Sequence, residues 1–168
     1  MHVQTTGARS QQAIISGARP EPDERQSVDI VLASDAHGAF AWGVLDRLLD
    51  ESGFAFNTIT ASGFAAVEAA VLVYGLGLGG RRGARIALTN FWRRVSHASM
   101  LTADRTDLLR SILNQSIDIE QIRNGRCTVK LSILAANART DALKIFTGDQ
   151  LTINAIVAAA TVPFLFPA

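Results

Sequence analysis

Apolar and polar residues follow a regular pattern from about residue 28 onward. The short β-branched run 28–32 and the segment 54–60 predict two buried strands. Between them, the apolar residues of 40–49 fall on one face of a helix, with charged residues opposite. The helix is expected to end near Ser52 and Gly53, where glycine suits a C-terminal cap. The pattern therefore predicts a strand–helix–strand unit.

The rest of the chain continues with segments of both periodicities. The further predicted elements are helices at 65–74, 81–95, 104–115 and 153–160, and strands at 127–135 and 143–147. Glycines between 75 and 80 predict a break between the first two of these helices. Residues 137–141 predict a hairpin turn between the two strands. The order of elements predicts an α/β fold with a mostly parallel sheet.

Two predicted strand-to-helix turns, at 33–38 and 60–65, are the first candidates for a binding site. Ligands in such folds lie at the carboxyl ends of the strands. The free backbone N–H groups of a helix start can hold an oxyanion or a phosphate. Ser62, at the apex of the second turn, can be a nucleophile of acyl transfer. The commoner role of a serine at a helix start is an N-cap, and both interpretations stay open.

Composition narrows the class of protein. The chain has 168 residues, 48% of them hydrophobic and 18% charged, with a formal net charge of +1. This balance indicates a globular domain and argues against a nucleic-acid binder. A single cysteine and three widely spaced histidines argue against a disulfide framework and a metal centre, and no cofactor is expected.

Residues 1–27 are polar and contain no apolar core of a secretory signal. They predict a disordered tail ahead of a single domain at 28–168. No segment reaches the roughly 18 uninterrupted apolar residues of a membrane span, so a cytoplasmic protein is expected.

Several segments together resemble the patatin-like phospholipases, a family of serine acyl hydrolases. They follow one another in the family's order, at 35–49, 59–70, 74–80, 83–85, 91–96, 129–147 and 156–166. The resemblance implies a patatin-like three-layer α/β/α sandwich around a mostly parallel sheet. It also implies hydrolysis of lipid esters, of the phospholipase A or lysophospholipase type, through an acyl-serine intermediate.

The chain departs from the family pattern at each catalytic element. The family's nucleophile lies in a Gly-x-Ser-x-Gly turn, and a gapless match puts that serine at Gly63, with Ser62 one residue early. The family's Gly-rich oxyanion loop matches 33–38, where the remnant consists of Ser34, Asp35, Ala36, His37 and Gly38. The catalytic Asp-Gly motif has no counterpart before Ala168, so the resemblance implies a C-terminally truncated domain.

These departures predict an impaired or inactive acyl hydrolase. Two alternatives stay open, a non-catalytic protein that binds lipid or a partner, and a weak esterase that depends on Ser62. For the second alternative, His37 would act as a base only with a nucleophile within hydrogen-bond reach.

Possible partners follow from charge and from the end of the chain. A basic run comprises Arg81, Arg82, Arg85, Arg93 and Arg94. No acidic residue occurs between Glu68 and Asp104, so we expect the run to lack acidic partners. It then forms either a solvated helix face or a peripheral contact with an acidic lipid surface. Apolar residues within 153–168 predict a protein partner that covers this segment.

Overall fold

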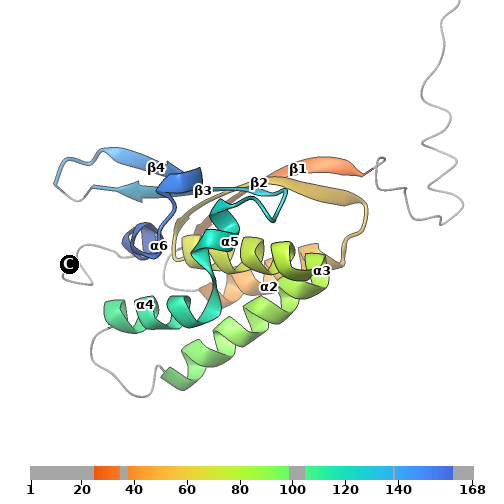
Figure 1. Ribbon diagram of the computed structural model, residues 1–168, viewed down its shortest axis with the longest axis horizontal. Coiled ribbons are helices and arrows are strands. Elements are labelled where there is room, and N and C mark those ends of the chain that lie inside the picture. The colour runs from red at the N-terminus through yellow and green to blue at the C-terminus, as the bar shows by residue number, and fades with distance from the viewer. Residues whose placement is uncertain (1–24, 35–37, 99–104, 138, 161–168) are drawn as a thin grey trace, which may run out of the picture.

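The computed structural model describes residues 25–34, 38–98, 105–137 and 139–160 (Figure 1). Its elements are, in chain order, β1 (Gln26–Ser34), α2 (Gly38–Asp50), β2 (Phe54–Gly63), α3 (Ala65–Ala98), α4 (Arg105–Ser116), α5 (Ile119–Arg123), β3 (Lys130–Ala136), β4 (Leu143–Thr147), the 3₁₀ turn η2 (Gly148–Gln150) and α6 (Ile153–Ala160). The α/β class predicted from the sequence pattern is confirmed.

The sheet has the strand order β1–β2–β3–β4. Strands β1, β2 and β3 are parallel, and β4 returns antiparallel to β3 as the predicted hairpin. The prediction of a mostly parallel sheet is therefore confirmed. Because the three parallel strands run the same way, their carboxyl ends share one edge, where Ser34 pairs with Gly63.

The described helices lie along one side of the sheet (Figure 1). On that side β2 and β3 contribute the buried residues Ile59, Ala61 and Ile133. They pack against the start of α3, where every residue of 65–73 is buried. Burial of this apolar surface is the main stabilising contribution to the fold.

The other side of the sheet is more open among the described residues. Val31 of β1 is 78% exposed, and Leu143 and Ile145 of β4 are 72% and 56% exposed. The strand register places all three on this side. The described residues thus supply the sheet and one helix layer.

Two boundaries differ from the sequence prediction. Strand β2 continues through Gly63, so the predicted turn at 61–63 is wrong. The strand extends because Ala61 and Ser62 pair with β1 on one side and with β3 on the other. Strand β1 begins at Gln26 and takes in the last two residues of the predicted tail. Residues 1–24 of that tail lie outside the described residues.

Helix α3 is two helices that meet at a kink. Gly79 and Gly80 have non-helical backbone angles, with φ of +58° at Gly80. The predicted break is confirmed, but the first helix continues past Gly75 before it ends. A Cβ on Gly75 would lie 2.5 Å from the Cα of Ala84, and one on Gly83 would lie 2.4 Å from the Gly75 carbonyl oxygen. Glycine therefore lets the two halves pack backbone to backbone.

Helix α6 closes the helical layer at the other end of the chain. Ala155, Ile156 and Val157 are buried, and the helix packs against β3, α3 and α4. The predicted bounds of this helix are confirmed. A protein partner for 153–168 stays a prediction, since residues 161–168 lie outside the described part.

Candidate functional site at the carboxyl edge of the sheet

The turn between β2 and α3 is unusually sharp. Gly63 ends the strand, Phe64 is the single connecting residue, and α3 begins at Ala65. Gly63 has a φ of +62°, in the left-handed region that favours glycine. The carbonyl oxygen of Phe64 accepts a hydrogen bond from the Val67 N–H at 3.0 Å, which starts the helical pattern at once. The chain thus reverses direction at Gly63 with almost no loop.

Ser62 lies within the strand rather than at the apex of the turn. It pairs with Ala33 of β1 and Leu134 of β3, and it is half-buried. Strand alternation turns its side chain away from the buried Ala61, toward the more open side of the sheet. No described side chain forms a hydrogen bond with its hydroxyl. Its role as a nucleophile stays a prediction.

The first strand-to-helix turn lies next to the second. Ser34 is the last residue of β1 and Gly38 is the first of α2. Because Ser34 pairs with Gly63, the two turns are neighbours at the carboxyl edge. Asp35, Ala36 and His37 lie outside the described residues, so the oxyanion function of this loop stays a prediction.

Glu68 is a residue of this edge that the sequence analysis did not single out. It lies in the first turn of α3 and is 0% exposed. Neither of its carboxyl oxygens has a hydrogen-bond partner in the described part of the chain. Burial raises the pKa of this carboxyl to about 7, while the Trp92 side chain and the Trp42 backbone act in the opposite direction. Both tryptophan groups lie near the carboxyl, but neither completes a hydrogen bond to it.

Aromatic rings from α2, from α3 and from the turn between β2 and α3 lie together in this part of the core. The rings of Trp42 and Trp92 stack with centroids 6.0 Å apart, and Phe64 lies 5.8 Å from Trp92. The indole nitrogens of Trp42 and Trp92 are buried and, like the Glu68 carboxyl, have no partner in the described ranges. We call these four residues the Trp–Glu cluster.

The cluster combines a titratable group with an apolar enclosure. A carboxyl with a pKa near 7 exchanges its proton at neutral pH, which suits an acid–base role. Because Glu68 is fully buried, a substrate reaches it only if the surrounding structure opens. The one signal for this residue in the sequence is a lone acid within an otherwise apolar helix segment, 65–73.

The basic run has acidic partners that the sequence did not predict. Arg85 forms ion pairs with Asp46 and Asp50 of α2, both at 2.6 Å, so the expected lack of acidic partners is wrong for this residue. The pKa of Asp50 is lowered by its hydrogen bond to Arg85. The sequence hid these pairs because the acids lie 39 and 35 residues before the arginine.

Arg81 is also held inside the fold. Its guanidinium donates to the carbonyl oxygens of Leu48, at 2.9 Å, and Leu49, at 3.2 Å, and also to that of Phe54. It lies over the ring of Phe54 with its carbon 5.1 Å from the ring centroid. We call Arg81 and Arg85 the arginine bracket, because they tie α3 to the end of α2 and the start of β2.

The other three arginines of the run are exposed. Arg93 donates to the side chain of Asn90, and Arg94 donates to the hydroxyl of Ser116, so neither of these contacts neutralises a charge. A contact with an acidic lipid surface stays a prediction, and it rests on Arg82, Arg93 and Arg94.

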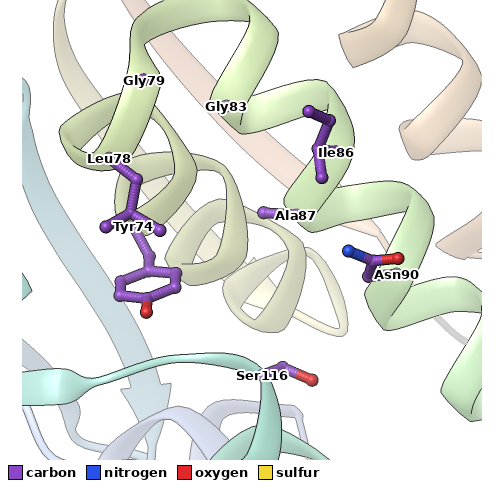
Figure 2. Close-up of a pocket in the computed structure, with 8 residues that line it drawn as sticks. All are labelled: Tyr74, Leu78, Gly79, Gly83, Ile86, Ala87, Asn90 and Ser116. Carbon is purple, nitrogen blue, oxygen red and sulfur yellow. The ribbon is translucent and has the colours of Figure 1, made fainter.

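A groove of about 300 Å³ lies beside the kink of α3. Figure 2 shows Tyr74 from the first half of the helix, Asn90 from the second half and Ser116 from the end of α4 around it. Leu78 and Ile86 add exposed apolar surface. The residues that line it include no acid, histidine or cysteine, so the groove offers shape and hydrogen bonds rather than catalytic groups.

The described residues contain no group of three or more histidine, cysteine or acidic side chains placed to hold a metal ion. None of their helices is long and apolar enough to cross a membrane. A scan against models of protein families and a search of curated proteins both found no match to this chain.

Proposed function

We propose that this chain is a patatin-like lipid acyl hydrolase domain whose catalytic turn lacks its nucleophile. The observation that supports the proposal is Gly63, which has a φ of +62° in a one-residue strand-to-helix turn. The resemblance assigns the family's catalytic serine to this position. A nucleophile elbow holds its residue in strained backbone at the end of a strand. Glycine adopts this backbone without strain but provides no hydroxyl.

The proposal includes the finer fold. It takes the sheet as the centre of a patatin-like three-layer sandwich, with the described helices as one outer layer. A second helical layer would cover the side of the sheet that carries Val31 and Ile145, both of which are exposed among the described residues. The exposed apolar side chains support this part of the proposal, since a sheet buries both faces when helices pack on each side.

The chemistry at this edge follows from the missing hydroxyl. Acyl transfer through a serine needs an oxygen at the turn and a base within hydrogen-bond reach of it. Position 63 has no side chain, and no described side chain is hydrogen-bonded to Ser62. A serine without a base is a poor nucleophile at neutral pH, so Ser62 does not replace the missing group.

The test is an assay of the purified chain with short-chain nitrophenyl esters and phospholipid vesicles, together with a serine-directed fluorophosphonate probe. We expect no turnover above background and no labelling. Gly63→Ser is expected to stay inactive as well, because catalytic groups act as a unit and one restored member recovers little. The matched control is Ser62→Ala.

Two outcomes would contradict the proposal. Turnover or labelling that disappears in Ser62→Ala would assign the chain a Ser62-dependent esterase activity. Robust hydrolysis by Gly63→Ser would show that a base is already positioned at the turn, so that only the hydroxyl was missing.

A further inference from the structure

A second cavity, of about 380 Å³, lies where β3 begins and β4 ends. It is separate from the carboxyl edge, because its lining residues Thr58 and Lys130 pair toward the opposite ends of β2 and β3. Its size falls within the range of about 300–1,000 Å³ that is typical of small-molecule sites. We propose that this cavity binds the phosphate group of a small organic phosphate.

Charge is the first argument for an anion. Arg123 and Lys130 line the cavity, and none of the lining residues is acidic. Lys130 is exposed and forms no ion pair with a described carboxylate. The Cys127 thiol also lines the cavity, and burial raises its pKa, so at neutral pH it adds no negative charge. The cavity wall therefore carries two positive side chains and no acid, with Arg123 paired to Glu120, which lies outside the wall.

The hydrogen bonding of Arg123 is the second argument. One terminal nitrogen of its guanidinium pairs with Glu120 at 2.7 Å. Its Nε is buried and has no partner in the described part of the chain. An unpaired buried N–H costs free energy, and an oxyanion that accepts this hydrogen bond recovers it. Because the Nε has almost no accessible surface, an anion in the cavity accepts its hydrogen bond only after the guanidinium turns toward the cavity.

The remaining lining groups define the kind of anion. Hydroxyls of Thr58, Ser132 and Thr147 add neutral donors, which suit an ion with several acceptor oxygens, such as phosphate. Ile122 and Leu151 form an apolar part of the wall. The combination favours a phosphate carried on an apolar group over an inorganic ion.

Calorimetric titration of the full chain with phenyl phosphate at low ionic strength tests this assignment. Arg123→Gln is expected to weaken binding about tenfold or more, since hydrogen bonds to charged groups are among the strongest. Lys130→Gln is expected to weaken it about threefold, because this lysine is exposed and solvent screens its charge. Arg126→Gln is the matched control, an exposed arginine outside the lining that removes the same charge. It is expected to leave binding within about twofold, because its charge is exposed and screened by solvent.

Further arms separate the sources of the phosphate. Tighter binding of phenyl phosphate than of inorganic phosphate or benzoate supports a soluble organic phosphate. Sedimentation with phosphatidic acid vesicles, weakened in Arg123→Gln and Lys130→Gln and kept in Arg126→Gln, supports the same chemistry on a lipid headgroup. Circular dichroism checks that each variant folds. If Arg123→Gln does not fold, Lys130→Gln still tests the assignment.

The assignment is overturned if neither phenyl phosphate nor the vesicles bind, or if benzoate binds as tightly as phenyl phosphate. It is also overturned if Arg126→Gln weakens binding as much as the two lining variants. These outcomes do not depend on ester hydrolysis, so the site and the proposed function are tested separately.

Discussion

The two ends of strand β2 differ in whether the polar side chains packed near them have partners. At its amino end, the arginine bracket pairs Arg81 with backbone carbonyls and Arg85 with two carboxylates. At its carboxyl end, the Trp–Glu cluster buries the Glu68 carboxyl and the indole nitrogens of Trp42 and Trp92 without partners among the described residues. The pairing of Arg81 and Arg85 is explained by a structural role, because it connects α3 to α2 and β2. Buried unpaired groups are rare in folded proteins, and functional sites are one of the places where they occur.

The largest expected effect concerns the unpaired carboxyl. The pKa of Glu68 rises from 4.5 to about 7 on folding, so between these values the folded state binds more protons than the unfolded state. Stability from this group is therefore fully present below about pH 4.5 and is lost as the pH rises through 7. From the pKa difference, the loss amounts to at most about 3 kcal/mol by pH 8.

Urea unfolding at pH 5 and pH 8 measures this effect, with Glu68→Gln as the non-titrating comparison. We expect the wild-type chain to lose more stability over this range than the variant does. Equal losses in the two proteins would show that the carboxyl is paired or hydrated, and the contrast between the two ends of β2 would then disappear.

The next largest effect concerns the arginine bracket. Arg81→Met removes the donors to three carbonyl oxygens at the end of α2 and the start of β2, and is expected to cost on the order of 2 kcal/mol of unfolding free energy. Arg82→Met is the matched control, because Arg82 is exposed and adjacent in sequence. Chemical denaturation of both variants gives the comparison. If the two substitutions changed stability equally, Arg81 would not be a structural tie.

The smallest effect concerns the turn beside the Trp–Glu cluster. Gly63→Ala forces a Cβ into backbone with a φ of +62° and is expected to cost about 1 kcal/mol. Gly63→Asn is expected to cost less, because asparagine tolerates this region better than alanine. Gly53→Ala, at a position with open space and no left-handed φ, serves as the control and is expected to change little. Thermal melts that rank Gly53→Ala as the most harmful would contradict the assigned turn geometry.

The local elements were predictable because their signals are local. Alternation and helical periodicity predicted β4 at 143–147 and α6 at 153–160 with their observed bounds. The glycines between 75 and 80 predicted a break, and the structure places it at Gly79 and Gly80, where glycine relieves the backbone constraint. Helix α5 was not predicted, because its five residues are too few to show a period.

The candidate site was predictable only in part. The sequence singled out two strand-to-helix turns as candidates, and the pairing of Ser34 with Gly63 makes them neighbours. It did not reveal that β2 reaches Gly63, since the pairing of Ala61 and Ser62 on both sides depends on β1 and β3. Nor did it single out Glu68, because a lone acid in an apolar segment carries no sign of its hydrogen-bond partners.

The sequence by itself determined the order and type of most elements, the parallel sheet with its final hairpin, and the glycines at the sharp turns. These features depend on side-chain periodicity and on backbone freedom, which act over a few residues. Tertiary structure alone decided that Arg85 meets Asp46, that Gly75 packs against Ala84, and that Glu68 is buried near Trp92. These outcomes depend on which distant segments pack together, because solvent exclusion and ion pairing arise only when the helices close over the sheet.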